Sequence, residues 1–272
     1  MFDTDGLSLA QIDGKPATVA DLTPLAFAGF AHFTAMQVRN GRVRGLDLHL
    51  ERLRDASRAL FDADIADDRV RSQLRSAIAA AGGEALSVTA TVFTRSGEFT
   101  AAGEKGDLSL LIRTSPASNG PEGPLRLAAV QHERVLPGFK HNGETAKTYY
   151  LRDAIKRGFD DAIFLDRQNR LSEATIWNVA YWDGSAVIWP VADVLHGVTM
   201  GILKRQLTEL GVLQRDVAVT PEMVGGFAGA VVMNSWTPGV SIIAIGETAI
   251  PAAPQFVELL HKAYLREPNV EI

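Results

Sequence analysis

The turn-rich segment SPASNGPEG, at residues 115–123, divides the chain into two parts. Each part contains strand-like runs of apolar residues and also the three-to-four-residue apolar spacing that is typical of helices. Because these patterns do not follow one another in a regular βαβ order, they predict an α+β fold. We expect a smaller N-terminal lobe over residues 1–117 and a larger C-terminal lobe over residues 118–272.

The N-terminal part begins with short strands around an IDG turn. Asn40-Gly41 then stands between two β-like runs, which is a strong hairpin signal because this dipeptide suits the tight turns of antiparallel pairs. The other elements predicted here are helices over 46–63 and 70–81 and strands over 86–94 and 108–114.

The C-terminal part mixes shorter strands with three helices. Its predicted strands lie near 125–131, 161–166, 178–182, 186–189, 229–234 and 240–245. Its predicted helices are one that ends near Gly158, one over about 200–211 and one over about 254–266. No internal repeat is visible, so neither part is expected to be a repeat array.

Composition excludes several classes of function. The net charge of −5 comes from 27 basic and 32 acidic residues that are mixed along the 272-residue chain, so no nucleic-acid-binding face is indicated. No apolar run has the roughly 20 residues of a membrane helix, and the first residues lack a basic lead and an apolar core. We therefore expect no membrane partner and a cytoplasmic location.

The absence of cysteine excludes disulfides, thiolate catalysis and thiolate-bound zinc. No two of the six histidines are three to five residues apart, so a helical metal pair is not predicted and we expect no metal site. The segment GETAKT at 143–148 has Ala146 where a phosphate-binding loop needs glycine, and the dinucleotide and nucleophile-elbow motifs are missing. Common nucleotide-binding and serine-hydrolase functions are thus disfavoured.

Lys140 and Glu173 are the strongest pair of chemical candidates. Lys140 follows Pro137-Gly138 at a predicted strand-to-helix junction, although most lysines are solvated surface charges. Glu173 lies in an apolar, strand-like run, where a carboxylate is unusual. Beside a lysine that could form an imine with pyridoxal phosphate, a carboxylate has a specific use: it keeps the ring nitrogen protonated, so that the ring can draw electrons from the substrate carbon.

Further residues could bind a phosphate. Val198 and Thr199 open a predicted helix after Gly197, where N–H groups and the positive end of the helix dipole favour an anion, although Thr199 could be an ordinary N-cap. Arg52 could add a charge-assisted hydrogen bond, and Ser235 a hydroxyl. An exposed arginine on a helix is the ordinary alternative for Arg52.

The order of these motifs resembles the class IV aminotransferases, which include branched-chain and D-amino-acid aminotransferases, (R)-selective amine transaminases and aminodeoxychorismate lyase. The resemblance covers residues 25–245. It rests on H-x-x-R-L at 49–53, Lys140 after Pro-Gly, G-F-D-D-A-I-F-L-D through S-E-x-x-x-x-N over 158–178, L-x-G-V-T at 195–199 and a strand that ends in Asn234-Ser235.

The resemblance implies a two-lobed fold type IV enzyme with pyridoxal 5′-phosphate between the lobes, a homodimer, and an amino donor and a 2-oxo acid as substrates. It implies that Lys140 carries the cofactor as a Schiff base, in preference to the rival Lys147, and that Glu173 pairs with the ring nitrogen. The other cofactor-binding residues that it implies are Arg52, Asn178, Val198, Thr199, Ser235 and Trp236.

Departures from the family pattern concern the substrate. Thr34 replaces a usual glutamate in the run from Gly29 to Ala35, and Phe33-Thr34 together with Lys140-His141 resembles aminodeoxychorismate lyase. We favour a transaminase, with a lyase that uses Thr34 near the lysine as the alternative and a non-catalytic binding protein as a third hypothesis. Candidates for binding the substrate carboxylate are His32, Gln37, Arg39, Arg95 and His141.

Overall fold

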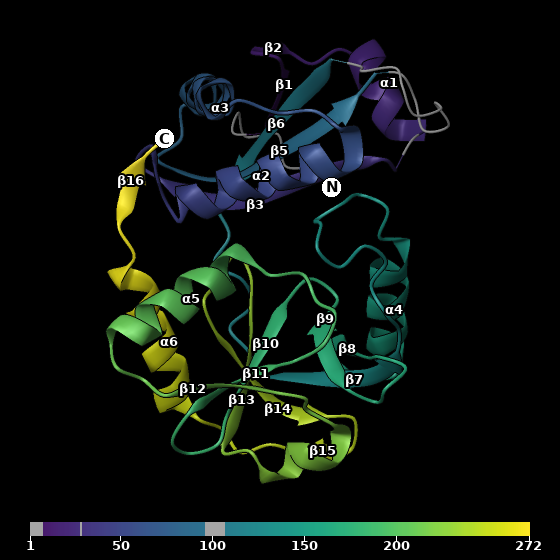
Figure 1. The fold of residues 1–272 in the computed structure, drawn as a ribbon, viewed down its shortest axis with the longest axis vertical. Helices are drawn as coiled ribbons and strands as arrows, with labels where there is room; N and C mark the ends of the chain where they lie inside the picture. The colour runs from purple at the N-terminus through teal and green to yellow at the C-terminus, as the bar shows by residue number, and fades with distance from the viewer. Residues whose placement is uncertain (1–7, 28, 96–106) are drawn as a thin grey trace. The chain divides into compact units, whose positions relative to one another are not determined.

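The computed structural model describes residues 8–27, 29–95 and 107–272, which form two compact units. Unit 1 contains the chain up to Ser118, together with Phe139–Gly143 and Asn269–Ile272. Unit 2 contains Asn119–Gly138 and Glu144–Pro268. The first seven residues, over which no leader was expected, lie outside the described residues. Both units combine one sheet with packed helices (Figure 1), so the predicted α+β class is confirmed.

Unit 1 is built on a seven-stranded antiparallel sheet with the order β16-β4-β3-β5-β6-β1-β2. Its strands are β1 (Leu9–Ile12), β2 (Lys15–Pro16), β3 (Ala31–Arg39), β4 (Arg42–Arg44), β5 (Ala85–Thr94), β6 (Leu108–Pro116) and β16 (Asn269–Glu271). The last strand of the chain, yellow in Figure 1, thus pairs with β4 from the beginning of the chain.

The predicted hairpin at Asn40-Gly41 is confirmed. Asn40 has φ 51° and Gly41 has φ 69°, so both residues adopt the left-handed conformation that a two-residue turn between twisted strands requires. Arg39 of β3 pairs with Arg42 of β4 across this turn.

Two amphipathic helices, α2 (Leu46–Phe61) and α3 (Asp67–Ala81), pack against the sheet of unit 1 and confirm the predictions from helical spacing. Leu50, Leu53 and Leu74 are buried in the core that they share with β3 and β5. The short helix α1 (Val19–Phe27) was not predicted. It contains Pro24 and no buried residue, so it lacks the apolar stripe by which an amphipathic helix is recognised in a sequence.

Strand β3 has two different faces, because side chains alternate across a strand. Residues 32, 34, 36 and 38 are buried, and Met36 and Val38 belong to the core under α2 and α3. Residues 33, 35, 37 and 39 on the opposite face are only partly buried. This alternation decides which of the candidate residues of β3 can reach a ligand.

Unit 2 contains a nine-stranded mixed sheet with the order β12-β11-β10-β13-β14-β7-β8-β9, and β15 pairs with β14. β7 pairs in parallel with both β14 and β8, and β11 with β12. Its strands are β7 (Leu125–Gln131), β8 (Asp161–Leu165), β9 (Leu171–Ala174), β10 (Asn178–Trp182), β11 (Val187–Pro190), β12 (Gln214–Val217), β13 (Gly229–Met233), β14 (Val240–Ile245) and β15 (Thr248–Ala249).

The helices of unit 2 are α4 (Thr145–Lys156), α5 (Val198–Glu209) and α6 (Pro254–Arg266), with the short 3₁₀ helix η1 (Pro221–Gly226). α5 and α6 share one core with β10, β11 and β13, while Ala154 of α4 packs on Ala162 and Phe164 of β8. The predicted helix ending near Gly158 is confirmed as α4. Within the described residues, no helix is both long and apolar enough to span a membrane.

Candidate functional site

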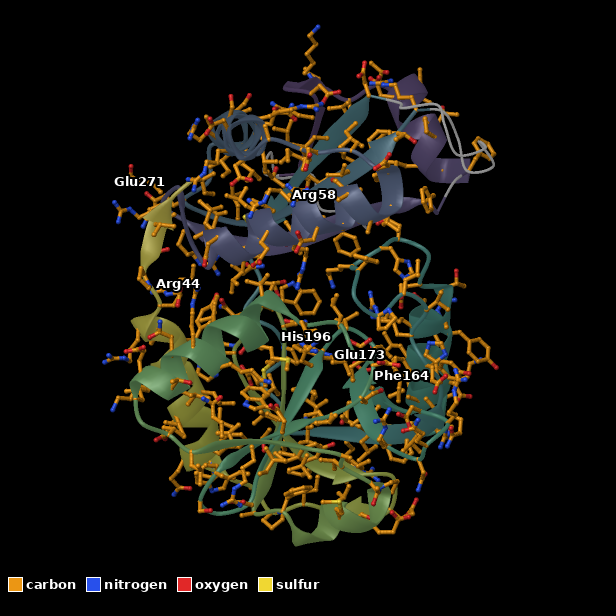
Figure 2. The ribbon with its side chains drawn as sticks, viewed as in Figure 1. Arg44, Arg58, Phe164, Glu173, His196 and Glu271 are labelled. Carbon is orange, nitrogen blue, oxygen red and sulfur yellow. The ribbon has the colours of Figure 1, made fainter. Side chains whose placement is uncertain are left out.

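Glu173 lies in β9, a four-residue strand in which every residue is buried (Glu173 is labelled in Figure 2). Its side chain is 4 % exposed and faces two cations: its Oε1 is 3.3 Å from Arg134 Nη1 and 3.7 Å from Lys147 Nζ. The backbone N–H of Leu195 donates to its Oε2 at 3.4 Å. A buried carboxylate with such partners is held in one orientation.

Glu144 completes a ring of four alternating charges. Its Oε2 lies 3.4 Å from Lys147 Nζ, and its Oε1 lies 3.5 Å from Arg134 Nη2. We call Arg134, Glu144, Lys147 and Glu173 the charge quartet; all four belong to unit 2. The side chains of Arg134, Glu144 and Lys147 are 1 %, 13 % and 12 % exposed, so water screens their interactions only weakly.

Burial lowers the pKa of Lys147, and the carboxylates of Glu173 and Glu144 oppose this effect. Burial is also the main cause that lowers the pKa of the nearby His132, whose ring feels the field of all four members of the quartet. The quartet is formally neutral when all its members are ionised. This balance explains how four ionisable side chains can share one buried position.

Asn178 forms two hydrogen bonds to the loop that precedes α5. Its Nδ2 donates to the Leu195 carbonyl at 2.6 Å, and its Oδ1 accepts from the Gly197 N–H at 3.0 Å. Glu173 holds the N–H of the same Leu195. Asn178, predicted as a cofactor-binding residue, therefore positions the start of α5 together with Glu173.

The start of α5 also adjoins the loop after β13. The Thr199 hydroxyl donates to the Asn234 carbonyl at 2.7 Å, and Asn234 Oδ1 accepts from the Trp236 N–H at 2.8 Å. No side chain caps α5 at Gly197. The structure thus brings the predicted phosphate-binding residues Val198, Thr199 and Ser235 to neighbouring segments of unit 2, and the exposed Trp236 follows Ser235.

Asp161 of β8 fixes the turn between β9 and β10 through hydrogen bonds. Its carboxylate accepts from the Thr175 hydroxyl at 2.7 Å, from Trp177 Nε1 at 2.9 Å and from the Ala162 N–H at 2.6 Å. Burial raises the pKa of Asp161. Since this turn connects Glu173 to Asn178, Asp161 supports both residues without lying beside them.

Lys140 belongs to unit 1, in the segment 139–143. Its carbonyl accepts from the Phe33 N–H at 2.8 Å. The next residue along the chain, His141, forms an isolated antiparallel bridge with His32 of β3. Its Nζ lies 4.9 Å from the centre of the Phe33 ring. The lysine is therefore carried by a backbone that is fixed to β3, on the partly buried face of that strand.

Thr34 and His32 lie on the opposite face of β3. The Thr34 hydroxyl is 2.6 Å from His49 Nδ1, and His32 Nε2 is 3.0 Å from the Ser57 hydroxyl of α2. Burial lowers the pKa of His32 to about 4 and that of His49 to about 3, so both rings are neutral near pH 7. The sequence suggested that Thr34 lies near the lysine, whereas its side chain points away from Phe33 and under α2.

The remaining candidates of β3 are on the face that carries Phe33. Gln37 Nε2 donates to the Ser87 hydroxyl at 2.8 Å, and Gln37 Oε1 accepts from the Ser118 N–H at 3.0 Å. Arg39 also donates to Gln37 Oε1, at 3.4 Å.

Arg52 is half-buried on α2, where its charge contributes to lowering the pKa of His49.

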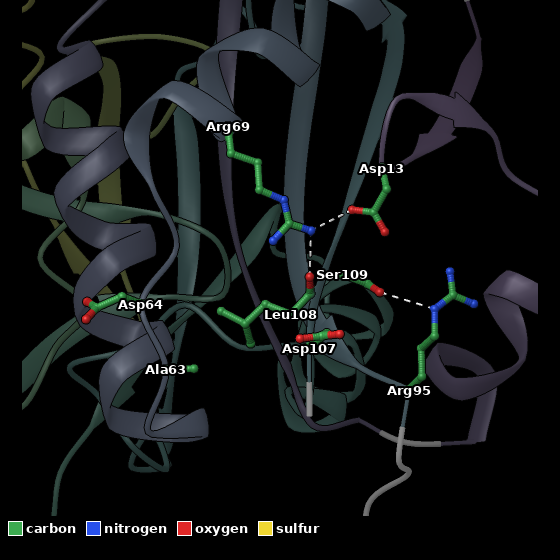
Figure 3. A pocket seen from close by; sticks show the side chains of 8 residues that line it. All are labelled: Asp13, Ala63, Asp64, Arg69, Arg95, Asp107, Leu108 and Ser109. Atoms are coloured by element: carbon green, nitrogen blue, oxygen red, sulfur yellow. Dashed lines mark hydrogen bonds and ion pairs between the residues drawn. The ribbon is translucent and has the colours of Figure 1, made fainter. Parts of the chain in front are cut away.

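Arg95 lines a separate pocket of unit 1 of about 620 Å³, shown in Figure 3. It donates to Asp21 at 2.8 Å and to the Ser109 hydroxyl at 3.3 Å. Across the pocket, Arg69 donates to Asp13 at 2.8 Å. Aspartates therefore already neutralise both guanidinium groups, which leaves little net charge for a substrate carboxylate.

Sequence reasoning missed Arg134 and Glu144. Glu144 could have been found, because it precedes Lys147 by three residues at the start of a helix, a spacing that pairs opposite charges. Arg134 follows a strand in a loop, and no periodicity distinguishes it from a surface arginine. Only the packing of that loop against β9 shows that Arg134 is buried.

Comparisons with known proteins identify the family and the fold of the chain. The family model described as amino-transferase class IV matches residues 31–245. No curated protein sequence matches the chain. A branched-chain aminotransferase from Thermoproteus uzoniensis is 20 % identical with a TM-score of 0.82, over 95 % of this chain and 94 % of that protein.

Two further solved structures share the fold. A putative 4-amino-4-deoxychorismate lyase from Legionella pneumophila is 20 % identical with a TM-score of 0.81, over 93 % of this chain and 96 % of that protein. The branched-chain aminotransferase from Escherichia coli is 15 % identical with a TM-score of 0.82, over 95 % of this chain and 93 % of that protein. These similarities confirm the predicted fold type.

Proposed function

The chain belongs to the class IV aminotransferases, whose cofactor is pyridoxal 5′-phosphate, and we propose that it uses Lys140 to move an amino group from an amino acid or amine to a 2-oxo acid. The observation that carries the proposal is the buried and oriented carboxylate of Glu173. A carboxylate in this state stabilises a protonated pyridine nitrogen, which strengthens the electron withdrawal by the cofactor ring.

The residues of unit 2 fit the cofactor. Glu173 supplies the acid, and the first N–H groups of α5, near Ser235, supply donors for a phosphate. Asn178 connects the two parts, because it hydrogen-bonds the loop that Glu173 also holds. From unit 1 we propose Arg52 as a further phosphate partner and Lys140 as the Schiff-base lysine.

The contact between Lys147 and Glu173 supports the choice of Lys140. Lys147 Nζ is at ion-pair distance, 3.7 Å, from the carboxylate that we assign to the ring nitrogen. In pyridoxal phosphate, the carbon that forms the imine is attached opposite the ring nitrogen. A ring therefore cannot lie between Lys147 and Glu173 as they stand, and a second lysine is needed for the imine.

When bound, the cofactor acts as an electron sink that stabilises negative charge at the substrate α-carbon. The task of Lys140 in this chain is proton transfer, because an amine held beside that carbon can accept its proton and return it to a neighbouring carbon. The backbone contacts of the Lys140 segment with β3 fix the position of the lysine backbone, from which Nζ would reach the substrate carbon. Glu173 keeps the ring nitrogen protonated meanwhile.

Replacement of Lys140 tests the proposal. We expect Lys140→Ala to lose the long-wavelength absorption of the cofactor's Schiff base and to lose amine transfer by at least about 100-fold. Lys147→Met should keep that absorption and serves as the matched control. A spectrum that survives Lys140→Ala but disappears in Lys147→Met would reverse the assignment.

The lyase alternative can be separated by its product. A lyase would release pyruvate from an amino-deoxychorismate-like substrate without any 2-oxo acid acceptor, whereas a transaminase requires the acceptor. We favour the transaminase because the Thr34 hydroxyl, the residue that suggested a lyase, bonds to His49 on the helix side of β3. Acceptor-independent pyruvate release would favour the lyase.

We also propose that the chain works as a homodimer. The proposal is supported by the family to which the chain belongs. Light scattering should give about twice the chain mass of 29.3 kDa at micromolar concentration. A monomeric mass for the active, cofactor-loaded protein would contradict it.

A further inference from the structure

We propose that Lys147 and Glu144 set the charge that Glu173 presents to the ring nitrogen of the cofactor, and thereby tune how firmly that nitrogen holds its proton. The inference rests on the proposed role of Glu173 and adds two positioning residues to it. Neither residue needs to contact the reacting atoms, because both act through the Glu173 carboxylate.

The geometry of the quartet supports this role. Lys147 Nζ lies between two carboxylates, 3.4 Å from Glu144 Oε2 and 3.7 Å from Glu173 Oε1. Arg134 bridges the same two carboxylates from the other side, at 3.3 Å and 3.5 Å. Each cation therefore interacts with both Glu173 and Glu144. The negative charge of Glu144 partly cancels the positive charge that Lys147 presents to Glu173.

Burial makes this coupling strong. The interaction between two charges about 4 Å apart is several times larger in a partly buried site than in bulk water. The fields of the quartet also act on the half-buried His132. Burial lowers the pKa of His132 and thus favours its neutral form, so its ring adds little charge beside the quartet near pH 7.

The two residues should act with opposite signs. Lys147→Met removes a positive charge and leaves the quartet with a net charge of −1, so Glu173 attracts the ring proton more strongly. Glu144→Gln removes a negative charge and leaves a net charge of +1, so Glu173 attracts it less. A purely structural role would not produce opposite electrostatic effects, since both changes would loosen the same cluster.

The cofactor-bound full chain, loaded with pyridoxal phosphate labelled with ¹⁵N in the ring, provides the first test. The ring ¹⁵N chemical shift reports the protonated fraction at each pH. We expect the ratio of protonated to unprotonated nitrogen to rise about tenfold in Lys147→Met and to fall about tenfold in Glu144→Gln, as for one charge at close range. Lys147→Arg, which keeps the charge, should stay near the wild type.

Matched controls come from the exposed side of the same helix. Lys156→Met and Asp153→Asn remove the same charges from α4 where water screens them. Both should leave the ring nitrogen unchanged. Shifts of the same sign in Lys147→Met and Glu144→Gln, or equal shifts in the controls, would overturn the inference.

A second measurement needs no cofactor. In the cofactor-free full chain, the ¹⁵Nζ signal of Lys147 can be followed by NMR as the pH is raised. Glu144→Gln should lower the pKa of Lys147 further, because Glu144 is one of the carboxylates that oppose the effect of burial. Asp153→Asn should not change it.

The two measurements separate the two ideas. An unchanged Lys147 titration in Glu144→Gln refutes the quartet as an electrostatic unit, whatever the enzyme catalyses. If Lys147 responds as expected but Lys140→Ala keeps the Schiff-base absorption, the quartet stands and the assignment of Lys140 fails. Circular dichroism of each variant identifies any change that comes from unfolding.

Discussion

Gly197 allows the loop before α5 to approach Asn178, and its replacement by alanine should be costly. A Cβ at this position would lie 2.1 Å from Asn178 Oδ1, more than about 1 Å short of an ordinary carbon–oxygen contact. Asn178 cannot rotate away without loss, because its side chain bonds both to the Gly197 N–H and to the Leu195 carbonyl.

The expected cost follows from these two hydrogen bonds. Asn178 is 8 % exposed, so groups released from it would be left with little access to water. Leaving buried polar groups without partners, together with overpacking, should reduce the free energy of unfolding by about 2–4 kcal/mol. The same movement would displace the start of α5, so the affinity for pyridoxal phosphate should fall as well.

Tryptophan fluorescence during urea unfolding is a suitable assay, because all four tryptophans of the chain lie in unit 2. Gly226→Ala is the matched control: a Cβ there would meet nothing within 4 Å, so stability should change by less than about 0.5 kcal/mol.

A double mutant isolates the contact. In an Asn178→Ala background, Gly197→Ala should cost less than about 1 kcal/mol, because the opposing oxygen is gone. The reasoning is refuted if Gly197→Ala alone is as mild as Gly226→Ala, or if its cost is the same with and without the Asn178 side chain.

Two further predictions concern buried polar groups. Between pH 6.5 and about 4, unfolded His32 and His49 bind protons that the folded rings do not, so the stability of unit 1 should fall by up to about 1.4 kcal/mol per pH unit for each ring as pH decreases. Urea midpoints from circular dichroism at pH 7 and pH 5 check this, and His49→Gln should reduce the difference. Asp161→Asn places an amide donor among three donors and should destabilise unit 2 by about 1–3 kcal/mol, with a changed emission from Trp177; wild-type stability would contradict the structural role of this carboxylate.

Local patterns were sufficient for most elements of the fold. Helices α2, α3 and α6 follow from apolar spacing, and the β3–β4 hairpin from Asn40-Gly41, because these signals depend only on neighbours along the chain. The short strands β12 and β16 were missed, and β9 was recognised only as a strand-like run without bounds. Strands of three or four residues carry too little alternation to be read, and they form only because a partner strand is already in place.

The candidate site was predictable in composition but not in arrangement. Lys140, Glu173 and Gly197 could be recognised in the sequence from their immediate neighbours. Lys140 follows a Pro-Gly turn, Glu173 is an acid in an apolar run, and Gly197 precedes a helix. Tertiary structure decided that Thr34 points under α2 and that Arg134 and Lys147 share Glu173. Those relations join residues that are distant in sequence, and only the packing of strands and loops determines which charges share a buried position.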